Sequence, residues 1–145
     1  MIALIQRVIE ASVEVEGRPL ARIGPGILAL VGVRRGDDAA TAQRLGVRIL
    51  SYRIFPDETG RMNRSLADIA GQLLVVPQFT LAADTRSGTR AGFGHAAEPQ
   101  AARALFDALV ARARQALPQV ETGEFGAHMR LSLVNDGPVT FWLEA

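Results

Sequence analysis

The chain has 145 residues, a formal net charge of +1, 48% hydrophobic residues and 21% charged residues. A chain of this length and apolar content folds most simply around one hydrophobic core, so we expect a single domain over residues 1–145. The nearly neutral charge argues against a protein that holds long stretches of nucleic acid, whereas contact with a short end of RNA is compatible with it.

The residue types that are missing narrow the chemistry further. The chain has no cysteine and no lysine, and its only histidines are His95 and His128. These absences exclude disulfides, thiolate metal sites, cysteine nucleophiles and Schiff-base lysines, so we expect no metal and no cofactor. No apolar run is long enough to cross a membrane and no secretion signal is evident, so we expect a cytoplasmic protein. Any catalysis has to come from hydroxyls, carboxylates, backbone amides or the substrate.

The first third of the chain predicts strands followed by a helix. Residues 2–16 indicate β structure, with clean alternation over 12–16, and a turn at 17–19 leads to a second strand at 20–23. The apolar run 27–33 is typical of a buried strand. A helix is expected over residues 37–50, because its acidic start suits the first turn and an apolar side follows.

The middle of the chain predicts two strands and a polar loop. Residues 52–55 indicate a short strand, and residues 56–60 have the composition of a turn. Residues 73–76 form an apolar run, which Pro77 ends because proline has no N–H for the sheet. The following loop, 84–92, carries two arginines. A strand end beside a basic loop is a suitable place for a site.

The last third predicts a helix and three strands. The helix runs from Glu98 to about Leu117, since proline in its first turn and apolar residues at helical spacing favour it. The strands cover 120–123, 129–134 and 139–143, with a turn at Asn135–Pro138 between the last two. The order ββ-α-β-β-α-βββ indicates an α/β domain with a mixed sheet, helices on one face and hairpins that are candidates for a second β layer.

Two short motifs carry more information together than apart. Alone, Gln78 and Thr80 are most simply interpreted as solvent-facing strand residues, and Gly137-Pro138 as an ordinary hairpin turn. Together, residues 78–85 and 133–140 strongly resemble the two signature motifs of the D-aminoacyl-tRNA deacylases, also called D-tyrosyl-tRNA deacylases. Further segments that look like this family at its spacing are Ile5–Val8, Ala11–Val13, Ile23–Gly26, Arg53–Phe55, Met62-Asn63 and Glu121–Ala127.

The resemblance implies an enzyme that hydrolyses the ester between a D-amino acid and the 3′ end of tRNA, and that also removes glycine mischarged on tRNA-Ala. It implies a homodimer in which a cis Gly-Pro element of one subunit enters the pocket of the other, with no role for DNA or a membrane. Gly137 and Pro138 would form a chirality filter, and Arg7 would brace it. Phe125 and Met129 resemble pocket residues for the terminal adenosine.

The resemblance of the first motif implies that Gln78, Phe79 and Thr80 are the catalytic residues. Thr80 has the only hydroxyl of the first motif, so it is the candidate nucleophile. No histidine or lysine lies near it in the sequence, and an unactivated hydroxyl is a weak nucleophile. We therefore favour attack by water assisted by the 2′-OH of the terminal ribose, with backbone N–H groups around Phe79 and Thr80 holding the oxyanion.

One departure from the family pattern leaves an alternative enzyme open. Pro77 stands where the family usually has serine, and a sister group that removes L-alanine from the wrong tRNA also carries proline before its glutamine. Phe79 and Val139 resemble the D-specific group, which we favour. The L-alanine-selective editing deacylase is the alternative.

The remaining polar candidates have two interpretations each. Arg86 and Arg90 are either solvated loop residues or phosphate contacts to the tRNA acceptor end. His128 is expected to be exposed rather than catalytic. Because a fold does not guarantee an activity, a non-enzymatic dimeric RNA-binding module is a further alternative.

Overall fold

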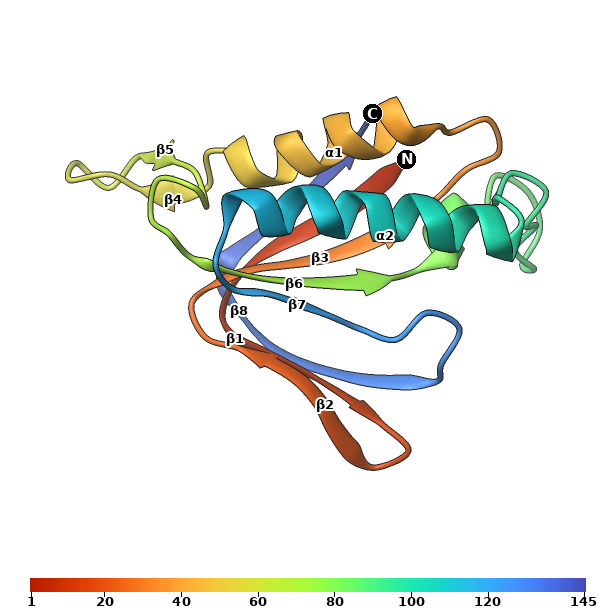
Figure 1. The fold of residues 1–145 in the computed structure, drawn as a ribbon, viewed down its shortest axis with the longest axis horizontal. Coiled ribbons are helices and arrows are strands. Elements are labelled where there is room, and N and C mark those ends of the chain that lie inside the picture. Colours follow the sequence, from red (N-terminus) through yellow and green to blue (C-terminus); the bar gives the residue numbers. More distant parts are fainter.

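The computed structural model describes residues 1–145, which form a mixed six-stranded sheet with two helices across one face (Figure 1). The sheet consists of β1 (Ile2–Val15), β2 (Arg18–Ile23), β3 (Gly26–Gly32), β6 (Gln72–Pro77), β7 (Val120–Thr122) and β8 (Met129–Glu144). The helices are α1 (Ala39–Ser51) and α2 (Pro99–Ala116). A small hairpin joins β4 (Phe55–Pro56) to β5 (Met62–Arg64), and a 3-10 helix, η1, covers Phe79–Ala82. The predicted α/β class is confirmed.

The long first strand organises the sheet. The strand order is β2-β1-β3-β6-β7, and β8 also pairs with β1. Residues 2–8 of β1 pair with β3, whereas residues 11–15 pair with β2, and β8 follows β1 along both parts. Strand β1 pairs antiparallel with β2, β3 and β8, whereas β6 pairs parallel with both β3 and β7. The far ends of β1, β2 and β8 therefore extend away from the helices, as Figure 1 shows.

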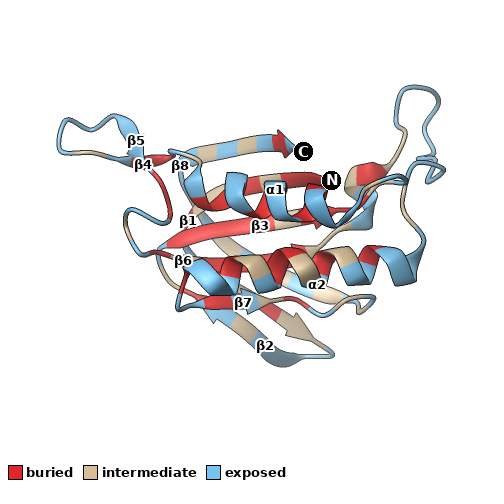
Figure 2. Cartoon of the chain, turned by 45° about the horizontal axis from the view of Figure 1, so that its top comes forward, coloured by how far each residue is buried: buried red, intermediate tan, exposed pale blue.

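The central strands are buried on both faces, and this produces two cores. In β6, Leu73 and Val75 join the core beneath the helices, whereas Leu74 and Val76 join a second core on the opposite face. The second core contains Val8, Ala11, Val13, Ile23, Leu28, Leu74 and Val76. Figure 2 shows the buried inner sides of α1 and α2 above the first core. A continuous apolar run is the pattern expected of a strand covered on both sides.

The C-terminal strand corrects one prediction. The turn predicted at Asn135–Pro138 is not a chain reversal, because β8 continues through it and stays antiparallel to β1. Asn135 lies opposite Val8 and Thr140 lies opposite Gln6, so residues 136–139 form a bulge at a register shift. The peptide bond between Gly137 and Pro138 in this bulge is cis. The strand β1 is long enough to pair with both parts of β8, which overrides the local turn chemistry.

Two smaller boundaries also differ from the predictions. Helix α1 begins at Ala39, because Asp38 is its N-cap and accepts a hydrogen bond from the Thr41 N–H at 2.7 Å. The strand expected at 52–55 is reduced to β4. Strand β6 ends at Pro77, as predicted, and the chain then turns into η1. Neither helix has the length and apolar character needed to cross a membrane.

Candidate active site

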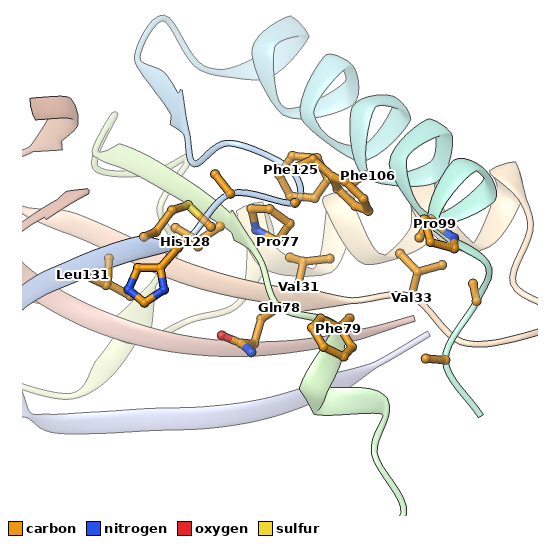
Figure 3. Close-up of a pocket in the computed structure, with 17 residues that line it drawn as sticks. Val31, Val33, Pro77, Gln78, Phe79, Pro99, Phe106, Phe125, His128 and Leu131 are labelled. Atoms are coloured by element: carbon orange, nitrogen blue, oxygen red, sulfur yellow. The ribbon is translucent and has the colours of Figure 1, made fainter. Parts of the chain in front are cut away.

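A cavity of about 530 Å³ lies where β6 ends and η1 begins (Figure 3). Its walls come from β3, the end of β6, the first half of α2 and the segment between β7 and β8. The lining residues are Val31, Val33, Val76, Pro77, Gln78, Phe79, Ala96, Ala97, Pro99, Ala102, Phe106, Phe125, Gly126, Ala127, His128, Met129 and Leu131. Most are apolar, and the volume lies within the roughly 300–1,000 Å³ typical of small-molecule sites.

The aromatic wall of the cavity is held from two sides. The ring of Phe125 packs against Phe106 with 6.3 Å between centroids and a tilt of 58°. The Arg103 guanidinium lies over the same Phe125 ring at 5.8 Å from its centroid. The sulfur of Met129 accepts a hydrogen bond from the Glu124 N–H at 3.3 Å. The structure therefore places the predicted residues Phe125 and Met129 in one cavity wall.

The first motif forms the edge of the same cavity. The Gln78 N–H donates to the Val31 carbonyl at 2.8 Å, which fixes the end of β6 against β3 before the chain turns. The side-chain amide of Gln78 donates to the Thr80 hydroxyl, and Phe79 packs on Phe93 with 5.2 Å between ring centroids. The Leu81 N–H donates to the Gln78 carbonyl at 3.3 Å, so the N–H groups of Phe79 and Thr80 precede this first helical hydrogen bond.

The Gly-Pro bulge is held by a partly buried arginine. Arg7 donates through Nη1 to the Ile54 carbonyl at 2.6 Å and through Nε to the Asp136 carbonyl at 3.2 Å. Gly137 has φ +131°, and a Cβ there would lie 2.6 Å from Cγ2 of Val139, so only glycine fits. Gly137, Pro138 and Arg7 therefore lie together, but none of them lines the cavity of their own chain.

The loop 84–92 is closed by hydrogen bonds of its first residue, Asp84. Asp84 and Gly92 exchange two backbone hydrogen bonds, at 2.7 and 3.0 Å. The carboxylate of Asp84 accepts from Nε and Nη2 of Arg86 at 2.9 and 2.6 Å, and these hydrogen bonds hold the pKa of Asp84 well below its usual range. Arg90 is exposed and has no ion pair. Neither arginine lines the cavity.

Sequence reasoning missed part of the cavity wall. Phe106 is one of the apolar residues at helical spacing in α2 and is 3% exposed, yet its ring also borders the cavity. Pro99 and Val33 reach the cavity in the same way. Helical spacing identifies an apolar side but does not tell a core residue from a cavity wall. His128 is exposed, as expected, although it lies at the cavity.

The comparison with protein families decides the assignment. The family model described as D-Tyr-tRNA(Tyr) deacylase matches residues 4–144. The chain belongs to this family. The resemblance seen in the two motifs is therefore confirmed along nearly the whole chain.

Individual relatives of the deacylase family agree. A D-aminoacyl-tRNA deacylase of Thioalkalivibrio sulfidiphilus (strain HL-EbGR7) is 66% identical over 144 residues, covering 99% of this chain and 97% of that protein. The protein of the same name from Alkalilimnicola ehrlichii (strain ATCC BAA-1101 / DSM 17681 / MLHE-1) is 61% identical over 145 residues, covering 100% and 97%. These matches span both motifs and every cavity wall.

Two solved structures share the fold of this deacylase family member. A protein described as c-Myc DNA Unwinding Element Binding Protein has a TM-score of 0.95 and 34% sequence identity, with 100% of this chain and 99% of that chain covered. A probable eukaryotic D-amino acid tRNA deacylase has a TM-score of 0.85 at 17% identity, covering 99% and 98%. The second likeness supports the fold alone.

Proposed function

We propose that this protein hydrolyses the ester bond of D-aminoacyl-tRNAs in the cytoplasm, releasing the D-amino acid and tRNA, and that it also acts on glycine mischarged on tRNA-Ala. Family membership over residues 4–144 supports the reaction class. The observation that carries the proposal is the position of Gln78 and Phe79 at the edge of an apolar cavity that Phe125 and Met129 wall. The terminal adenosine would occupy the cavity, and the ester would lie at its edge beside η1.

The surroundings of Thr80 favour catalysis by the RNA. Its hydroxyl accepts a hydrogen bond from the Gln78 amide, a group that cannot take a proton. No other side-chain hydrogen bond reaches that hydroxyl, so it lacks the general base that an acyl-transfer nucleophile needs. In the proposed step the 2′-OH of the ribose assists a water molecule, which attacks the ester carbon. The N–H groups of Phe79 and Thr80 stabilise the oxyanion, and the 3′ oxygen leaves with a proton.

A homodimer would complete the site with the Gly-Pro bulge of the partner. Gly137 and Pro138 lie outside the cavity of their own chain, on the strand β8, which pairs only with β1 and so leaves one edge open. Ile9, Val134 and Trp142 are large apolar residues of β1 and β8, and each is about half exposed. An open edge with exposed apolar side chains is suited to a second copy. Inserted into the cavity of the other subunit, the bulge would crowd the side chain of an L-amino acid.

The loop arginines would contact phosphates of the acceptor end. Arg90 has no ion-pair partner and is available for such a contact, whereas Arg86 would share its guanidinium with Asp84. Such contacts predict an affinity that falls with salt.

The deciding experiment is hydrolysis by the purified protein of D-Tyr-tRNA, L-Tyr-tRNA, Gly-tRNA-Ala and L-Ala-tRNA. We expect the D-aminoacyl and glycyl esters to be cleaved and both L-esters to persist. Selective cleavage of the L-alanyl ester would instead identify the editing enzyme of the sister group. Binding without any cleavage would favour a nucleic-acid-binding module. The similar solved structure described as c-Myc DNA Unwinding Element Binding Protein is named for such binding.

A further inference from the structure

The helical layer carries the unbalanced positive charge of the protein. The helices α1 and α2 contain five arginines and one acidic residue, a net charge of +4, whereas the whole chain carries +1. The arginines are Arg44, Arg48, Arg103, Arg112 and Arg114. None of the five forms an ion pair. Of the eleven arginines elsewhere, six do so: Arg7, Arg18, Arg22, Arg34, Arg35 and Arg86.

Two of these arginines without an ion pair lie beside the cavity, and Nη2 of Arg114 donates to the Val120 carbonyl at 3.5 Å. Arg103 and Arg114, three turns apart on one side of α2, line a separate recess of about 320 Å³ between α2, β7 and the start of β2. This recess shares Phe106 and Phe125 with the cavity, so the two hollows are the two sides of one aromatic wall. Arg112 points to the other side of the helix, where it lines a shallow groove with Arg44 and Arg48.

We propose that this recess binds the backbone phosphates of the single-stranded 3′ end of the tRNA, immediately next to the terminal nucleotide. The proposal rests on the proposed function, because it follows the RNA outward from a terminal adenosine held by Phe125. A strand that leaves the cavity across the aromatic wall reaches Arg103 first, since this guanidinium already lies over the Phe125 ring. The planar fork of a guanidinium matches the geometry of a phosphate.

The carboxylates that line the recess allow a test, because removing an acidic or a basic side chain should change the binding affinity in opposite directions. Asp107 and Glu124 also line it, yet neither is within ion-pair distance of an arginine. If a phosphate binds here, loss of an arginine weakens binding, whereas loss of the Asp107 charge strengthens it. Two substitutions in one recess then shift the affinity in opposite directions, which a purely structural role of these residues does not produce.

The experiment measures binding of an uncharged tRNA minihelix, with and without its single-stranded 3′ end, as a function of salt. The double variant Arg103→Gln/Arg114→Gln is expected to bind the full minihelix about tenfold more weakly near 0.1 M salt. The slope of log K against log salt should decrease by about 1.4, since each single-strand phosphate contact contributes about 0.7. The variant Asp107→Asn should bind more tightly, and Arg44→Gln, an exposed arginine of the distant groove, should bind as the unmodified protein does.

Three results would overturn the proposal. The first is an unchanged affinity and salt slope in the double variant. The second is an equal loss for the minihelix that lacks its single-stranded end, since the contact would then lie on the stem. The third is weaker binding of Asp107→Asn. Restoration of the slope by Arg103→Lys/Arg114→Lys would support it, with thermal unfolding as the check that each variant is folded. Hydrolysis of D-Tyr-tRNA by the unmodified protein tests the proposed function separately.

Discussion

Replacement of Arg7 by methionine should lower stability and weaken chiral selection together. Methionine keeps much of the aliphatic volume but removes the hydrogen bonds to the Ile54 and Asp136 carbonyls. The Arg7 side chain is only 13% exposed, and its contact with the Ile54 carbonyl is partly buried, so that carbonyl loses a partner that water replaces poorly. The contact with the Asp136 carbonyl is exposed, so water can replace it more readily. The ion pair with Asp136, whose side chain is 50% exposed, adds little.

The size of the effect follows from these contacts. A hydrogen bond to a charged donor contributes about 1.5–3 kcal/mol, so we expect a loss of about 3 kcal/mol in the free energy of unfolding. For a chain of this size that corresponds to a Tm lower by about 6–12 °C. The Gly-Pro bulge loses its anchor to β1, so the ratio of D- to L-Tyr-tRNA hydrolysis should decrease by about tenfold or more, equivalent to about 1.4 kcal/mol.

Urea unfolding and paired hydrolysis assays measure both quantities, and Arg22→Met is the matched control. Arg22 is also a sheet arginine with a carboxylate partner, Glu10, but its side chain is 73% exposed, so its loss should cost less than about 1 kcal/mol. An Arg7→Met protein that is no less stable than this control would refute the bracing role. A destabilised variant that keeps its full D-selectivity would show that Arg7 supports the fold but not the filter.

Three further changes test other parts of the structure. Thr80→Ala should keep turnover of D-Tyr-tRNA within about tenfold, whereas a loss of about 10⁴-fold or more would identify its hydroxyl as the nucleophile. Gly26→Ala should prevent folding, as judged by circular dichroism, because the new Cβ would lie 1.9 Å from the Gln72 carbonyl oxygen; a folded variant would contradict the tight β3–β6 pairing. Hydrogen bonds from Thr41 lower the pKa of the Asp38 carboxyl from its ordinary value of 3.8, so the ionised carboxyl stabilises the folded state. The free energy of unfolding should therefore decrease as the pH falls below 3.8 and this carboxyl becomes protonated. Asp38→Asn, which can still cap the helix, should reduce this dependence in thermal melts at pH 3 and pH 6, and an unaltered dependence would assign it to other carboxylates.

The sequence predicts best where the local pattern and the tertiary environment agree. The apolar runs of β3 and β6 predict buried strands, and both strands do contribute side chains to the two cores, while the helical spacing of α2 matches its position over the first core. The bulge in β8 was not predictable from its own residues. Asn135–Pro138 has the chemistry of a chain reversal, and only pairing with a distant β1 turns it into a bulge.

The residues of the candidate site also differ in whether a local sequence pattern could identify them. Gln78 and Phe79 were found because they are adjacent in a motif, whereas Phe106 and Arg103 gain their roles only through contact with Phe125, a residue of another element. Helical periodicity alone places these two residues on an apolar and a solvated side of α2. Contacts between elements far apart in the sequence give no local signal, and cavity walls are built largely from such contacts.

The separation of the two motifs in space has a consequence for how selectivity can be changed. Hydrolysis would depend on η1 and the end of β6, and the filter would depend on the bulge of β8, with Arg7 of β1 as its anchor. Within one chain the bulge does not reach the cavity, so the two parts would meet only across a dimer. A change in the anchor should therefore alter the choice of enantiomer more than the rate for the D-ester. A change at η1 should alter both rates equally, because it affects the oxyanion contacts that every ester requires.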